Sequence, residues 1–170
     1  MWIWMMILFF VFTIGLTVGG LLSAAKQPPQ LLHVIFFTLV FGLLTYLGMI
    51  VGMFLFPFFA IWFIEILIVI VTLLFIVATA TSFHPTFGFF KQDRGIGLIM
   101  LAALFFLMGF EWGIIEMRTF FTLLATALFL LALFIGLFVQ QQIQMAMWRI
   151  SYIVYTPLIW LLFVSIIKLL

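Results

Sequence analysis

The chain has 170 residues, of which 69% are hydrophobic, 20% aromatic and 6% charged, and its formal net charge is +2. Soluble domains are on average about 45–50% apolar and about 25% charged, so this composition excludes a water-soluble fold. It also excludes a disordered chain, because disordered segments are poor in apolar residues. The lack of cysteine excludes disulfides and thiolate metal sites, and the few Lys and Arg residues form no patch for nucleic acid.

The apolar runs predict the architecture. A membrane-spanning helix needs about 20 apolar residues, and the chain length allows about six of them with short loops. We therefore predict an all-α, polytopic integral membrane helical bundle that forms a single transmembrane domain over residues 1–170. The expected helices cover residues 2–25, 31–56, 58–80, 95–112, 119–139 and 145–167. A bundle of five helices is the alternative.

The first apolar run ends at two prolines, Pro28 and Pro29, which cannot continue a helix. A cleaved signal peptide is the alternative, since residues 23–25 (Ser-Ala-Ala) resemble a cleavage site. A signal peptide carries positive charge before its apolar core, whereas the first basic residue here is Lys26. We therefore favour a retained first helix.

Prolines and polar residues predict the later boundaries. Pro57 divides the long apolar run 31–80 into two helices. Residues 113–119 form the expected turn between the fourth and fifth helices, and glutamines within 140–144 end the fifth. Pro157 lies inside the expected sixth helix and is predicted to kink it.

Basic residues predict the orientation. The loops after the first, third and fifth helices, with the start of the sixth, carry Lys26, Lys91, Arg94 and Arg149, and the opposite side carries Arg118 and Lys168. Because Lys and Arg favour the cytoplasmic side, we expect the loop 81–94 in the cytoplasm and both termini outside. The general composition is typical of a small bacterial multi-span protein of the plasma membrane.

Glu65 is the acidic residue that lies deepest in an expected helix. A charge inside a membrane span is costly, so this carboxyl needs a proton, a partner or water. At about 1.5 Å per residue it lies about 10 Å from the outer end, at the level of Tyr46, Thr122 and Thr126. We predict an intramembrane polar cluster of these four residues. A proton or cation site and a purely structural carboxyl remain equal alternatives.

Two further groups of charged residues lie at the expected membrane faces. Glu111, Glu116 and Arg118 would form an outer vestibule, although ordinary closure of a helical hairpin is the simpler interpretation. On the other side, Lys91 and Arg94 are candidates to contact anionic lipid headgroups. One His and one Asp nine positions apart do not make a metal site, and we expect neither metal nor cofactor.

Small residues predict where helices approach closely. Gly15 and Gly19 form one G-x-x-x-G motif, and Gly48 and Gly52 form another. The two motifs are not at the same expected depth, so one of them is a candidate contact for another membrane protein or a second copy of the chain.

The sequence contains no catalytic motif, and we expect a protein that is not an enzyme. The first hypothesis is an accessory, regulatory or assembly protein that acts through helix contacts. The alternative is a small transporter or channel for protons, cations or a small solute that uses Glu65. The expected partners are the lipid bilayer and another membrane protein or a second copy.

Overall fold

The computed structural model describes residues 2–24, 31–55, 61–83, 89, 95–117, 119–146 and 151–169. Within them 93% of the residues are helical and no strand occurs, which confirms the all-α prediction. The helices are α1 (Trp2–Leu22), α2 (Leu31–Leu55), α3 (Ile61–Thr81), α4 (Ile96–Ile114), α5 (Thr119–Ala146), the short 3₁₀ helix η2 (Ser151–Tyr155) and α6 (Thr156–Leu169). Among the described residues, five helices are long and apolar enough to cross a membrane.

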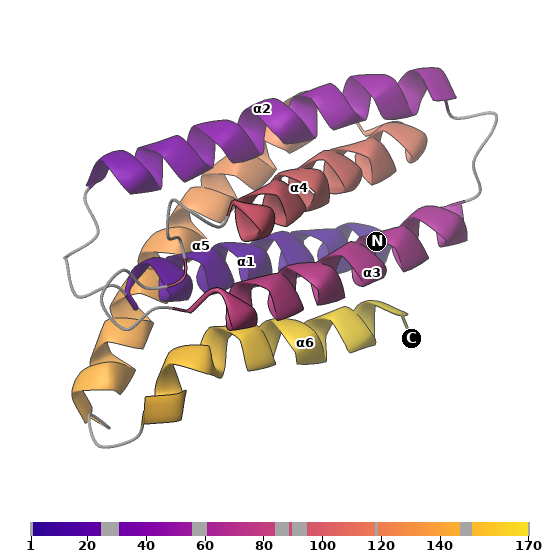
Figure 1. The fold of residues 1–170 in the computed structure, drawn as a ribbon. Helices are drawn as coiled ribbons and strands as arrows, with labels where there is room; N and C mark the ends of the chain where they lie inside the picture. The colour runs from indigo at the N-terminus through magenta and orange to yellow at the C-terminus, as the bar shows by residue number, and fades with distance from the viewer. Residues whose placement is uncertain are drawn as a thin grey trace.

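The helices run alternately up and down in one bundle (Figure 1). Both chain termini lie at one end of the bundle. Helices α1, α3 and α5 have their first residues there, and helices α2, α4 and α6 have their last residues there. We call this the terminal end. Helix α2 packs mainly on α4, α1 mainly on α5, and α3 on both α4 and α6. These pairings decide which side chains of the terminal end can meet.

Helices α1 and α5 approach closely along a row of small residues. A Cβ atom at Gly15 would lie 2.7 Å from the Cβ of Ala132. A Cβ at Gly19 would overlap the carbonyl oxygen of Leu133, and one at Gly136 would overlap the backbone of α1. Close backbone approach through small residues is the usual way to pack helices where lipid removes the hydrophobic driving force.

Helices α2 and α4 are joined in the same way, with glycines from both partners. A Cβ atom at Gly48 would overlap the carbonyl oxygen of Phe106, and one at Gly109 would overlap the backbone of α2. A Cβ at Gly52 would lie 3.1 Å from the Cα of Gly113. The glycines of both motifs are therefore covered inside the chain.

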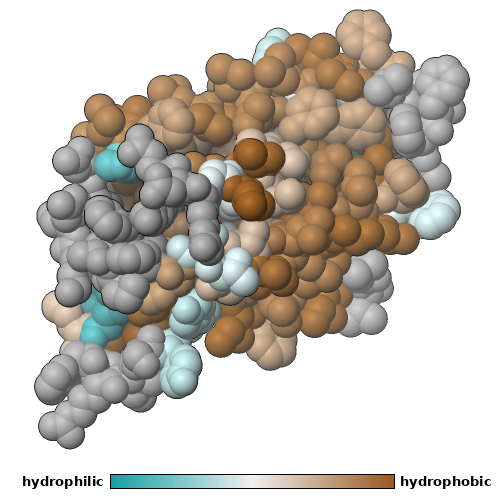
Figure 2. Space-filling view, in the orientation of Figure 1, coloured by the Kyte–Doolittle hydropathy of each residue, from teal (hydrophilic) through white to brown (hydrophobic). Residues whose placement is uncertain are grey.

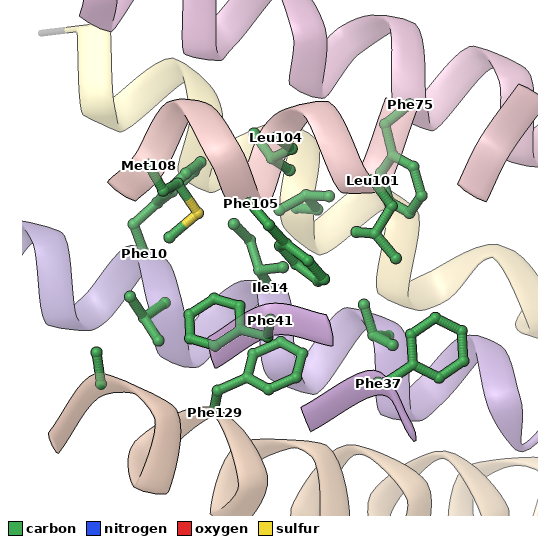
Figure 3. Packing of buried hydrophobic residues seen from close by; sticks show 14 of the residues in the cluster. Phe10, Ile14, Phe37, Phe41, Phe75, Leu101, Leu104, Phe105, Met108 and Phe129 are labelled. Atoms are coloured by element: carbon green, nitrogen blue, oxygen red, sulfur yellow. The ribbon is translucent and has the colours of Figure 1, made fainter. Parts of the chain in front are cut away.

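Aromatic rings fill the centre of the bundle where α2, α4 and α5 meet (Figure 3). The rings of Phe41 and Phe129 are stacked with their centroids 4.2 Å apart, and the ring of Phe105 lies edge-on to Phe41 at 5.0 Å. The indole of Trp112 extends this group at 6.3 Å from Phe41. All four side chains are fully buried, so the middle of the bundle is closed by packed rings.

Helix boundaries near residues 113, 139 and 145 differ from the predicted ones. Residues 145 and 146 belong to α5 and α6 begins at Thr156, so the expected start of the sixth helix at residue 145 was wrong. Gly113 lies inside α4, not in a turn, because α2 packs against it too closely for a side chain. Helix α5 continues through the glutamines to Ala146. Glutamine is a good helix former, and the buried Gln140 donates from Nε2 to the Ile153 carbonyl oxygen at 2.8 Å. The expected end at residue 139 was therefore wrong.

The predicted kink at Pro157 was also wrong. Pro157 is the second residue of α6, which begins at Thr156 directly after the 3₁₀ helix η2. Proline is tolerated in the first helical turn, where its missing N–H would have no intrahelical acceptor. It therefore starts the helix instead of bending it. The predicted turns at Pro28, Pro29 and Pro57 lie outside the described residues.

The outer faces of the bundle are largely apolar. In Figure 2 hydrophobic residues cover most of the visible described surface, and the most hydrophilic ones lie toward the end opposite the termini. In the most apolar 18-residue segment of α2, and likewise of α3, only 33% of the residues are buried within the chain. Large apolar side chains project outward at regular helical spacing on α2, namely Leu32, Phe36, Leu39 and Leu43.

Candidate functional site: a charged network at the terminal end

Three ionisable side chains from three helices lie near each other at the terminal end. Glu65 lies about one turn after the start of α3, Glu111 about one turn before the end of α4, and Lys168 is the second-last residue of α6. The packing of α3 on both α4 and α6 places them at a common level. We refer to Glu65, Glu111 and Lys168 as the charged network.

Glu111 and Lys168 form a buried ion pair. The Lys168 Nζ atom donates to both carboxylate oxygens of Glu111, at 2.7 and 3.0 Å. The side chains of Lys168 and Glu111 are only 7% and 3% exposed. The same ammonium lies 4.7 Å from the centroid of the Phe10 ring, which adds a cation–π contact from α1. The pair thus joins α4 to α6 and connects both to α1.

Glu65 belongs to the same electrostatic environment but is not part of the pair. Its carboxyl is half-buried on α3, which packs on both of the helices that carry Glu111 and Lys168. Among the described residues, no hydrogen bond or ion pair reaches it. The network therefore has two carboxyl groups and one ammonium, and the ammonium is engaged by Glu111.

The predicted cluster of Glu65 with Tyr46, Thr122 and Thr126 does not form. Tyr46 is 43% exposed on the outer side of α2. The hydroxyls of Thr122 and Thr126 donate within their own helix, to the carbonyl oxygens of Thr119 and Thr122. The physical reason is helix pairing: α2 and α5 carry these residues, whereas α3 packs against α4 and α6. Equal depth therefore did not make these residues neighbours.

The structure separates the two acidic residues of the predicted vestibule. Glu111 is buried in its ion pair, which corrects its expected position in an open vestibule. Glu116 is exposed in the turn after α4, where its φ of 58° is in the left-handed region. Arg118 and the predicted lipid contacts Lys91 and Arg94 lie outside the described residues.

Sequence reasoning missed the role of Lys168. Lys168 contributed only to the predicted orientation, although its distance from the helix end puts it at the same expected membrane face as Glu111. An acidic and a basic residue at the same depth of an apolar bundle predict an ion pair, because an unpaired buried charge is costly. Which carboxyl takes the lysine could not be decided without the helix neighbours.

A second feature lies toward the opposite end of the bundle. A pocket of about 310 Å³ opens between α1, α5 and α6. Its lining is mostly apolar and includes Leu16, Gly20, Ile143, Pro157 and Trp160. Its polar side chains are engaged: the Thr17 hydroxyl bonds to the carbonyl oxygens of Thr13 and Pro157, and Gln140 bonds to Ile153.

The described residues contain no group of three or more His, Asp or Glu side chains that could hold a metal ion. The charged network is thus a set of two carboxyls and a lysine, in which Glu111 and Lys168 form an ion pair. Comparison of the chain with protein-family models, with curated proteins and with solved structures gives no match.

Proposed function

We propose that this chain is a polytopic integral membrane protein with six membrane-spanning segments, located in a bacterial plasma membrane. Five long apolar helices support the proposal. The sixth segment would be η2 together with α6, whose 5 and 14 residues reach about 31 Å. That length is close to the hydrocarbon thickness of about 30 Å.

We further propose that the protein acts without catalysis, as an accessory, regulatory or assembly protein whose outer helix faces contact another membrane protein. The packed ring cluster of Phe41, Phe105 and Phe129 carries this proposal, because it closes the bundle centre to a hydrated path. Three buried hydroxyls support it as well: those of Thr13, Thr45 and Thr72 donate to carbonyl oxygens of their own helices. The buried Thr79 hydroxyl has no such bond among the described residues. The surface available to a partner therefore consists chiefly of apolar helix faces.

The charged network favours a second candidate function. Glu65 is a carboxyl without a hydrogen bond among the described residues, and it lies beside a buried ion pair. Such intramembrane groups often mark proton or cation pathways. The second candidate is therefore a small transporter or channel for protons, cations or a small solute, with Glu65 as its ionisable group.

One pair of measurements separates the two functions. A photo-reactive residue in place of Phe36 or Leu39 on the outer face of α2 should cross-link in cells to one membrane protein, with the buried Phe41 position as the negative control. Purified protein in vesicles should show no pH-driven ion flux. Flux that is lost in Glu65→Gln would replace the accessory proposal by the transporter, and cross-links to lipid alone would contradict a protein partner.

The orientation gives a separate prediction, and the lack of cysteine in the chain makes it simple to test. Thr119 lies at the terminal end and Ser82 at the opposite end. With both termini outside, a membrane-impermeant maleimide should label the Thr119→Cys variant in intact cells. It should label the Ser82→Cys variant only after the membrane is opened. The reverse pattern would invert the proposed topology.

A further inference from the structure

We propose that the charged network is a binding site for one exchangeable proton, which Glu65 holds while Lys168 is paired with Glu111. The inference goes beyond the accessory role. It rests on the membrane part of the proposed function, because it needs apolar surroundings in which charges are poorly solvated.

The first step is the charge balance of the network. Lys168 is the ammonium of the network, and its Nζ atom is committed to both carboxylate oxygens of Glu111. An ionised Glu65 would add a second negative charge at the level of Glu111, on a helix that packs directly on α4. In apolar surroundings such like charges are strongly unfavourable, and a shared site then retains a proton. One proton on Glu65 makes the whole network neutral.

The second step is that no other described group can supply the missing charge. Helix α3 packs on α4 and α6, whose ionisable residues among those described are Glu111 and Lys168. Helix α1 contributes the Phe10 ring, which contacts Lys168. Glu116 follows α4 in an exposed turn and is acidic, so it does not compensate Glu65.

The third step concerns access. The Glu65 side chain is half-buried about one turn from the terminal end, whereas Glu111 and Lys168 are nearly fully buried. A proton that leaves the Glu65 carboxyl converts it to a carboxylate and passes to water at this end of the bundle. The new carboxylate then competes with Glu111 for the Lys168 ammonium, so proton loss weakens the ion pair that joins α4 to α6.

Infrared spectroscopy of the purified protein tests this directly, because a protonated carboxyl and a carboxylate have separate carbonyl bands. Side-chain carboxyl ¹³C-labelling of glutamate restricts the signal to Glu65, Glu111 and Glu116. At pH 7 the wild-type protein should show one protonated glutamate. That band should be lost in Glu65→Gln and unchanged in Glu116→Gln, which is the matched control.

The decisive variant is Glu111→Gln, in which Lys168 is released and can pair with Glu65. The protonated band should then disappear although Glu65 is still present. A wild-type spectrum without the band, or a band that persists in Glu65→Gln, would overturn the proposal. A band retained in Glu111→Gln would show that Lys168 is not shared and would overturn it too. None of these results bears on cross-linking in cells, so failure here is distinct from failure of the accessory role.

Discussion

Lys168→Met should destabilise the bundle by about 3–5 kcal/mol, because the buried Glu111 carboxylate would lose its counter-ion. Methionine keeps most of the apolar stem of lysine, so the change removes chiefly the ammonium. The ammonium makes two hydrogen bonds to Glu111 and a cation–π contact with Phe10, and all of these are lost together. Denaturant unfolding in detergent micelles, followed by the near-ultraviolet signal of the aromatic side chains, measures the effect.

The double variant Lys168→Met/Glu111→Gln gives the control for this prediction. A buried pair replaced as a whole leaves no uncompensated charge, so the double variant should be clearly more stable than Lys168→Met alone. If instead the two single effects simply add, Glu111 and Lys168 do not stabilise the protein as a pair. Such additivity would also remove the electrostatic basis of the proton site.

The helical architecture could be predicted from the sequence because its apolar runs are long enough for membrane-spanning helices. A segment exposed to lipid must satisfy its hydrogen bonds internally, so apolar runs of this length are expected to be helical. The second helix illustrates this, since residues 31–56 were predicted and Leu31–Leu55 is observed. Where the chain is apolar, the length of the run and the prolines or polar residues at its ends are sufficient to predict the helix.

Residues with two possible roles were predicted less well. Gly113 follows charged and aromatic residues and suggested a turn, but its missing side chain is used for the contact with α2. Pro157 suggested a kink, but a helix that starts one residue earlier tolerates it. Tertiary packing decided the role of Gly113, and the position of the helix start decided that of Pro157.

The candidate site was only partly predictable. The depth of Glu65 follows from its distance to the helix end, and it indicated an unusual carboxyl. Its neighbours depend on which helices are adjacent and on how each helix is rotated about its axis. A hydrophobic run without a distinct polar face predicts neither the adjacent helices nor the rotation. The sequence therefore predicted the threonines of α5 as neighbours of Glu65, whereas the structure places the Glu111–Lys168 pair there.

The close contact between α2 and α4 leads to the second prediction of large effect. Gly109→Ala should destabilise the protein by about 1–3 kcal/mol, because its Cβ would overlap the backbone at Thr45 and force the two helices apart. The backbone on the other side cannot move away as a flexible side chain could. The loss should appear as an earlier unfolding transition in the same micelle assay.

Gly97→Ala in the same helix is the matched control. Among the residues that the structure describes, its Cβ would meet only the Thr79 hydroxyl oxygen, at 3.4 Å, which is ordinary contact. Alanine is favoured over glycine inside a helix by about 0.8–1.0 kcal/mol, so Gly97→Ala should leave stability unchanged or raise it. Gly97 lies in the first turn of α4, where alanine gains no more helix propensity than at the interior Gly109. A stability lower in Gly109→Ala than in Gly97→Ala therefore reports the α2–α4 contact. If Gly109→Ala is as stable as Gly97→Ala, close backbone approach does not hold this helix pair together.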